Sequence, residues 1–119
     1  MVIVFDVDGT LIGGEQRDWP SFDRAIEATL GFAPDAAFWE SIEEVTGRAI
    51  LKQAAAKVGC EVDDGGIETF CDRYMENLRA AIEDHPGAFR PRRGTLQVLR
   101  ALQADSIFGV AIATGDFQG

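Results

Sequence analysis

Asp6 and Asp8 are the residues of this 119-residue chain whose types and spacing are best suited to chemistry. They stand two positions apart at the end of the apolar run 2–5, so both carboxylates project to the same side of an extended chain. Close carboxylates repel each other, which favours a shared proton or a bound cation such as Mg²⁺. With the cation bound, one carboxylate is able to act as a nucleophile while the other transfers a proton. The alternative is a turn that simply ends a strand.

A strand has to position these two residues. The run 2–5 is unbroken and β-favouring, typical of a parallel strand that is buried on both faces, and Gly9 permits a sharp turn after it. The end of such a strand is where open α/β sheets bind their ligands. A second apolar run, 107–113, predicts a second strand that leads into Thr114 and Gly115.

Helical periodicity fills the region between the two strands. Four amphipathic helices are expected: one with Pro20 in its first turn and Gly31 as its C-cap, one opening at residues 34–35 and carrying Ile42 and Val45, one following residues 46–47, and one from about Ile67. A direct crossover needs only a dozen or more residues. The spacing therefore predicts a helical domain, residues 13–86, inserted into an α/β domain made of residues 1–12 and 87–119.

The expected sheet domain is incomplete. One further helix is expected after Gly94, with Leu96, Leu99 and Leu102 on one face. Two strands with this one helix cannot bury strands that are apolar on both faces. One side of the first strand would be an open edge, so we expect oligomerisation, domain swapping or poor solubility.

The segment 6–11, Asp-Val-Asp-Gly-Thr-Leu, resembles the first motif of the haloacid dehalogenase-like (HAD) hydrolase superfamily. The segment 110–115 resembles the second motif, and residues 91–94 resemble the return to the core. The insert resembles a C1-type helical cap, as in the branch that contains phosphoglycolate phosphatases and β-phosphoglucomutases. The resemblance implies an incomplete HAD-like Rossmannoid parallel sheet with an inserted all-helical cap, and it covers the N-terminal portion of the family fold.

The resemblance also implies roles for individual residues. Asp6 would attack phosphorus, become an aspartyl phosphate and bind Mg²⁺. Asp8 would protonate the leaving alcohol and then deprotonate the hydrolytic water, and its backbone carbonyl would coordinate the metal. The Thr114 hydroxyl and the Gly115 N–H would hold phosphoryl oxygens. An Asp at position 8 favours phosphate esters over halides, so the implied activity is a magnesium-dependent phosphatase acting on a small phosphorylated metabolite.

Residues 46–48, Thr46-Gly47-Arg48, are the candidate specificity element. Gly47 lets the backbone approach a ligand, and Arg48 at a helix N-terminus makes a local anion site. The alternative is a plain helix start in which Thr46 caps the helix and Arg48 is solvated.

Composition excludes several other classes of protein. The formal net charge of −9 argues against a nucleic-acid binder and against docking on an anionic membrane. No window resembles a membrane span or a secretory signal, and two cysteines do not make a disulfide scaffold or a zinc site. A cytoplasmic protein with reduced thiols is the expectation.

Two further motifs of the family, a Lys and a pair of acids, lie beyond its second strand, where this sequence has only residues 116–119. We therefore expect the 119 residues alone to be catalytically crippled. A phosphomutase is a close alternative, and a non-catalytic module that binds a phospho-ligand or a partner is an alternative of a different class.

Overall fold

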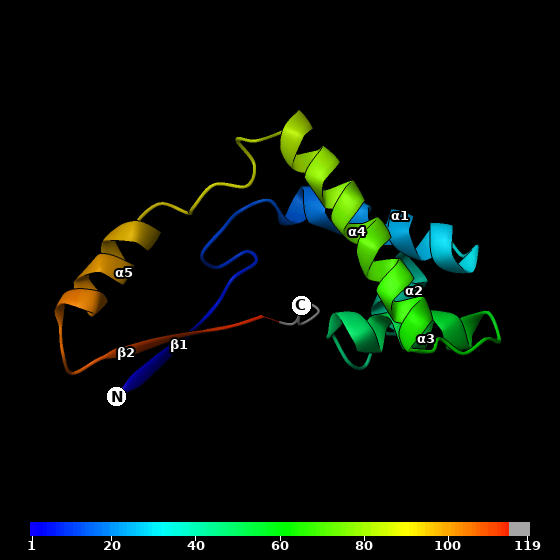
Figure 1. Ribbon diagram of the computed structural model, residues 1–119, viewed down its shortest axis with the longest axis horizontal. Helices are drawn as coiled ribbons and strands as arrows, with labels where there is room; N and C mark the ends of the chain where they lie inside the picture. Colours follow the sequence, from blue (N-terminus) through cyan, green and yellow to red (C-terminus); the bar gives the residue numbers. More distant parts are fainter. Residues whose placement is uncertain (115–119) are drawn as a thin grey trace.

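The computed structural model describes residues 1–114, with the backbone alone for residues 15–17. The elements follow the order β1 (Val2–Asp6), α1 (Glu15–Leu30), α2 (Ala36–Glu40), α3 (Gly47–Lys57), α4 (Asp64–Asp84), α5 (Thr95–Ala104) and β2 (Gly109–Ala113). Figure 1 shows two units: β1, β2 and α5 form a strand unit at one end, and α1–α4 form a helical unit at the other. None of the helices in the described residues is both long and apolar enough to cross a membrane.

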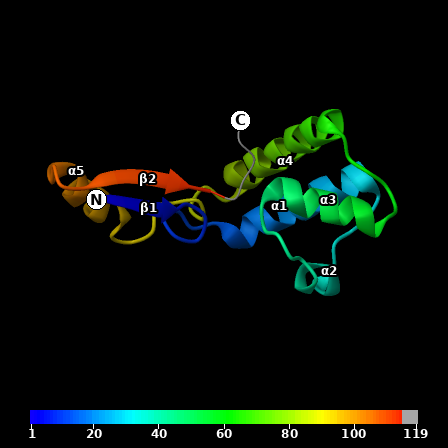
Figure 2. The same ribbon diagram turned by 90° about the horizontal axis from the view of Figure 1, so that it is seen from below.

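The strand unit contains two parallel strands, which confirms the predicted α/β fold class. Val2 pairs with Gly109 and Asp6 with Ala113, so the strands are in register along their whole length. Figure 2 shows that both strands point toward the helical unit, which places their carboxyl ends against it.

The strands are not buried on both faces in the described residues, which agrees with the expectation that two strands and one helix cannot bury them. Val2 is 66% exposed, Val4 59% and Ile112 62%. Ile3 and Phe5, which point to the opposite face from Val2 and Val4, are partly buried, whereas Ile112, the partner of Phe5 on that same face, is exposed. The reason is that α5, which packs against β2, is the only described helix of the strand unit, so the sheet is incompletely covered.

The helical unit has the buried core that the strand unit lacks. α1 packs along α4, and α3 contacts α1 (Figure 1). Apolar side chains from all four helices meet there: Phe22, Ala25, Ile26, Phe38, Ile50, Leu51, Ala54, Ile67, Phe70 and Tyr74. The rings of Phe22 and Phe70 lie edge to face with centroids 5.0 Å apart, an arrangement that aromatic quadrupoles favour.

Three helix boundaries differ from the predicted ones. α1 begins at Glu15, so Pro20 lies inside the helix rather than in its first turn. α2 ends at Glu40, because the Ser41 hydroxyl donates to the Phe38 carbonyl and the following loop, with Ile42 and Val45, is held outside the helix. α4 begins at Asp64, where the Asp63 side chain caps it by accepting from the Gly66 N–H at 2.8 Å.

The two linkers between the units run side by side. The Gly13 N–H donates to the Arg90 carbonyl at 3.0 Å, and the Arg92 N–H donates to the Leu11 carbonyl at 2.9 Å. Gly14 has φ 111°, and a Cβ atom there would lie 2.6 Å from the Phe89 ring. Gly14 is therefore required both by its backbone conformation and by the close approach of the second linker.

Candidate active site

The loop after β1 holds Asp6 in a fixed orientation. The N–H groups of Thr10, Leu11 and Ile12 all point to the Val7 carbonyl, at 2.9 to 3.2 Å. The Thr10 hydroxyl donates to Oδ2 of Asp6 at 2.9 Å. Sequence reasoning quoted Thr10 as part of the motif without giving it this role; its spacing of four residues from Asp6 in a tight loop was the signal.

The register of the sheet brings the second predicted segment to the same edge. Asp6 pairs with Ala113, so Thr114 is the next residue at the carboxyl end of β2. Thr114 therefore leaves the sheet beside the loop that carries Asp8. Gly115, the other predicted phosphate ligand, lies outside the described residues.

Asp6 and Asp8 line one cavity of about 340 Å³. The helical unit provides the rest of its described lining, namely Asp18, Trp19, Phe22, Val45, Gly47, Ile50 and Tyr74. The two predicted catalytic residues thus border the same space, at the end of the strands where the two units meet.

Asp18 adds a third carboxyl group to this cavity. The Tyr74 hydroxyl donates a hydrogen bond to Oδ1 of Asp18. Burial raises the pKa of Asp18, the Tyr74 hydrogen bond lowers it, and the negative charge of Asp8 raises it further. Sequence analysis missed this pair, because Asp18 and Tyr74 are 56 positions apart and only the packing of α1 on α4 brings them together.

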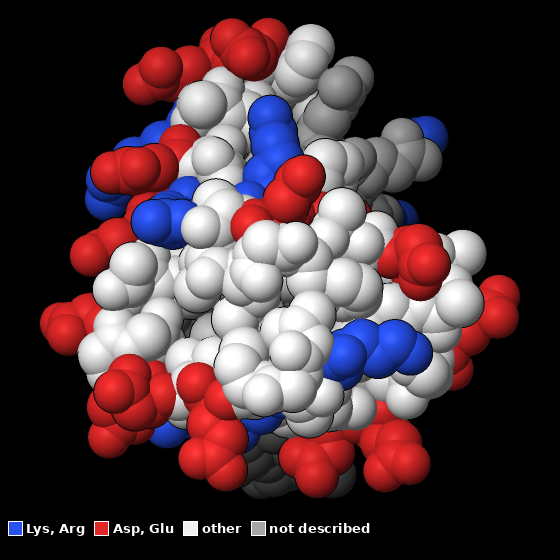
Figure 3. Space-filling view, turned by 90° about the vertical axis from the view of Figure 1, so that its right-hand side faces the viewer, with Lys and Arg blue, Asp and Glu red and all other residues white. Residues whose placement is uncertain are grey.

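The electrostatics of the cavity favour a cation. No Lys or Arg occurs among its described lining residues, whereas three carboxyl groups do. Figure 3, which looks onto the helical unit, likewise shows more acidic than basic side chains, with uncharged side chains across the middle. A phosphate group would be repelled here unless a cation neutralised part of the charge.

The residues present fit Mg²⁺, which prefers oxygen ligands and usually keeps several waters. The carboxylates of Asp6 and Asp8 are the oxygen donors that the described residues offer at the strand ends. The described residues contain no group of three His, Cys, Asp or Glu side chains arranged to hold a metal. Water would therefore supply much of the coordination shell.

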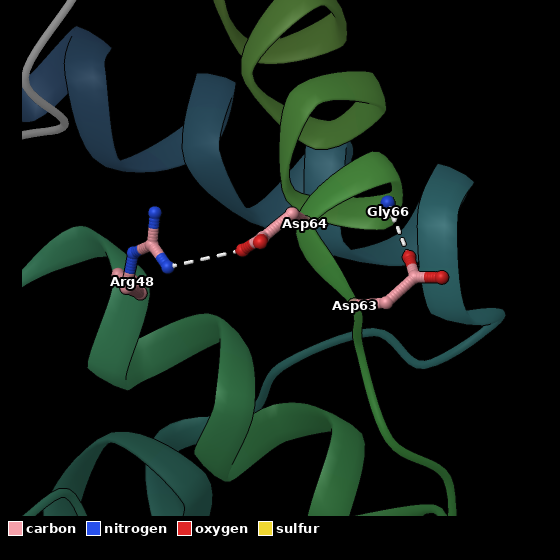
Figure 4. Close-up of polar contacts among 4 residues, drawn as sticks. All are labelled: Arg48, Asp63, Asp64 and Gly66. Atoms are coloured by element: carbon pink, nitrogen blue, oxygen red, sulfur yellow. Dashed lines mark hydrogen bonds and ion pairs between the residues drawn. The ribbon is translucent and has the colours of Figure 1, made fainter.

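The three residues of the predicted specificity element, Thr46, Gly47 and Arg48, do not all line the cavity. Gly47 is buried and lines the cavity. Thr46 caps α3, its hydroxyl accepting from the Ala49 N–H at 3.3 Å. Arg48 lies 3.4 Å from Oδ1 of Asp64, at the start of α4 and outside the cavity lining (Figure 4). A contact between Arg48 and a substrate stays a prediction.

Comparison with known proteins identifies the class to which this fold and site belong. A family model described as "Hydrolase: haloacid dehalogenase-like hydrolase" matches residues 1–119. The chain belongs to the haloacid dehalogenase-like hydrolase family.

Individual relatives agree with this assignment. A phosphoglycolate phosphatase of Mesorhizobium japonicum is 26% identical over 121 residues, covering 98% of this chain and 50% of the relative. A crystal structure described as a predicted phosphoglycolate phosphatase from Haemophilus somnus 129PT has a TM-score of 0.60 at 15% identity, covering 99% of this chain and 52% of the other; at that identity it supports the fold. The chain spans about half the length of these relatives.

Proposed function

We propose that this chain carries the nucleophile and the general acid–base of a magnesium-dependent phosphomonoester hydrolase that acts on a small phosphorylated metabolite. The observation that carries the proposal is the shared cavity of Asp6 and Asp8 at the carboxyl end of β1. Membership of the HAD-like family and the phosphatase name of the relatives support it. In this proposal, residues 1–12 and 87–119 form the catalytic core and residues 13–86 form its cap.

The first half of the reaction assigns one step to each aspartate. A carboxylate oxygen of Asp6 attacks the phosphorus atom, the bond from phosphorus to the ester oxygen breaks, and an aspartyl phosphate forms. Asp8 donates a proton to the departing oxygen, which leaves as an alcohol. The hydrogen bond from Thr10 to Oδ2 of Asp6 holds the nucleophile in one orientation for this attack.

The second half regenerates both groups. A water molecule attacks the phosphorus of the aspartyl phosphate while Asp8 takes its proton, and the Asp6 carboxylate leaves. The Thr114 hydroxyl and the Gly115 N–H bind phosphoryl oxygens through both halves. The Asp6 carboxylate and the Asp8 backbone carbonyl would hold Mg²⁺, which would supply positive charge to offset the negative charge of the phosphoryl group.

Phosphate binding tests this arrangement without requiring turnover. Because the cavity is acidic, inorganic phosphate should bind the chain about tenfold tighter with Mg²⁺ than without, a difference of about 1.4 kcal/mol. That is well within the roughly 4 kcal/mol of a close pair of unit charges near a protein surface. Isothermal titration calorimetry measures both dissociation constants.

Two variants locate the effect. Asp8→Asn should reduce the difference between the phosphate dissociation constants measured with and without Mg²⁺. The reason is that it removes one of the carboxylates that attract the cation. Asp72→Asn makes the same change of charge at an exposed position of α4 and should leave the difference unchanged. Phosphate binding that is independent of Mg²⁺ would contradict the proposal.

A further inference from the structure

Val45 lies in the loop between α2 and α3, residues 41–46, and forms part of the wall of the candidate active site. It lines the cavity of Asp6 and Asp8, and it also lines a second cavity of about 490 Å³, whose lining includes both tryptophans. Its side chain is nevertheless 76% exposed, so side-chain packing does little to hold it in place. The position of Val45 in the cavity wall therefore depends on what fixes the backbone of its loop.

The loop is anchored at both ends by the neighbouring helices. At its start, the Ile42 N–H donates to the Trp39 carbonyl at 3.4 Å. At its end, the Thr46 hydroxyl accepts from the Ala49 N–H as the N-cap of α3. Residues 43–45, between these anchors, belong to no helix or strand, so their backbone groups lack the partners that regular structure supplies.

The half-buried side chain of Gln53, on α3, supplies partners for this segment. Its Oε1 accepts from the Glu43 N–H at 3.0 Å, and its Nε2 donates to the Glu44 carbonyl at 2.9 Å. The same Nε2 donates to the Ala49 carbonyl at 3.2 Å, which ties the side chain to its own helix. A primary amide offers an acceptor oxygen and two donor hydrogens, and all of them are used here. Within the described structure, these are the hydrogen bonds that reach residues 43–45.

We propose that Gln53 is a positioning residue for substrate binding, which holds the loop so that Val45 stays in the wall of the cavity of the two aspartates. Gln53 is not among the described lining residues of that cavity; it acts through Glu44, the residue next to Val45. The inference rests on the proposed function, since it takes this cavity as the place where the substrate binds. The position requires an amide, because a carboxylate has no donor for the Glu44 carbonyl and an ammonium group has no acceptor for the Glu43 N–H.

Two ligands distinguish the position of the loop from the binding of the phosphate group. Inorganic phosphate needs only the strand ends and Mg²⁺, whereas phenyl phosphate adds a ring that meets the cavity wall. Gln53→Met removes all three hydrogen bonds while keeping the length and the helix propensity of the side chain. Gln103→Met makes the same change at an exposed position of α5 and is the matched control. Isothermal titration calorimetry with Mg²⁺ gives both dissociation constants for each chain.

Gln53→Met should weaken the binding of phenyl phosphate about tenfold, or about 1.4 kcal/mol, because a loop that is no longer held has to be ordered when the ester binds. It should leave the dissociation constant of inorganic phosphate unchanged, and Gln103→Met should change neither value. An equal change for both ligands, or no change for phenyl phosphate, would overturn the inference while leaving the proposed function intact. Phosphate binding that is independent of Mg²⁺ would overturn the proposed function and the inference with it.

The methyl resonances of Val45 report on the same loop without any ligand. In a ¹H–¹³C spectrum, Gln53→Met should move them toward the chemical shifts of an unfolded chain, while those of Val58, the C-cap of α3, should stay in place. Val45→Ala assigns the resonances, and Val45 resonances that do not move would overturn the inference. If Gln53→Met does not fold, Gln53→Glu, which keeps the acceptor for Glu43 but has no donor for Glu44, should show the same loss of affinity for phenyl phosphate.

Discussion

The two units of this molecule differ in how they are stabilised. In the helical unit, Phe70, Leu51 and Ile26 have no exposed surface. In the strand unit, α5 has no buried residue and Val4 is 59% exposed. The predicted catalytic aspartates nevertheless lie on the strand unit, at the end that meets the helices. The comparison teaches that the well-buried core lies in the helical unit, whereas the aspartates proposed to be catalytic lie on the less buried strand unit.

The largest difference between the two units is expected when one phenylalanine ring is removed from each. Phe70→Ala should lower the free energy of unfolding by about 3–5 kcal/mol, because it empties the centre of the helical core. Phe108→Ala removes a partly buried ring just before β2 and should cost about 1–2 kcal/mol. Urea unfolding followed by far-UV circular dichroism measures both. Equal losses would mean that the two units contribute equally to stability.

The next largest loss of stability is expected at Gly14, in the linkers between the two units. Gly14→Ala should cost about 2–3 kcal/mol, because it combines a φ of 111° with a Cβ placed 2.6 Å from the Phe89 ring. Gly31→Ala is the matched control: its φ is 67°, but nothing lies within 4 Å of its Cβ, so about 1 kcal/mol is expected. Thermal unfolding compares the two variants. A milder effect at Gly14 than at Gly31 would show that the linkers are not packed as described.

The free energy of unfolding should depend on pH through Asp18, which lies in the helical unit. Its pKa in the folded chain is raised, chiefly by burial, above the roughly 3.9 of an exposed aspartate. The folded state therefore holds this proton more tightly than the unfolded state. The stability from this group is complete below the unfolded pKa and is lost as pH rises through the folded pKa.

Asp18→Asn should consequently stabilise the chain more at pH 7 than at pH 4, relative to the unaltered chain. Urea titrations at the two pH values measure this, with Asp72→Asn as the exposed control. A benefit that is the same at both pH values would show that the Asp18 proton is not held by the fold.

The smallest effect is expected at the surface of the helical unit. The side chains of the Arg48–Asp64 pair are 57% and 95% exposed (Figure 4), and exposed pairs contribute less than about 1 kcal/mol. Arg48→Ala should therefore barely change the melting temperature. It should also leave the affinity for phenyl phosphate unchanged if Arg48 stays with Asp64; a clear loss of affinity would instead support the substrate contact that the sequence suggests.

The sequence predicts the strand unit better than it predicts the cavity. An unbroken apolar run that ends in Asp6 is a local signal, and so is the run that leads to Thr114; both strands form as expected, and the family assignment follows. The helices are also predicted, but their ends depend on capping side chains such as Asp63 and on the Ser41 hydroxyl, which compete with the apolar periodicity.

The cavities could not be predicted, because they depend on contacts between distant segments. Asp18 meets Tyr74, and Asp23 meets Trp39, only after α1 has packed against the other helices. Each of these residues alone fits an ordinary amphipathic helix. Arg48 shows the converse: its local pattern suggests an anion site, whereas the fold supplies Asp64 as its partner.

The measurement that tests the central claim most directly is ¹⁹F NMR of the chain with Mg²⁺ and beryllofluoride, an analogue of the phosphoryl group that bonds to a carboxylate oxygen. The account predicts a bound fluorine resonance that requires Mg²⁺, disappears in Asp6→Asn and persists in Asp72→Asn. A bound resonance that survives Asp6→Asn, or no bound resonance in the unaltered chain, would contradict the claim that Asp6 is the nucleophile.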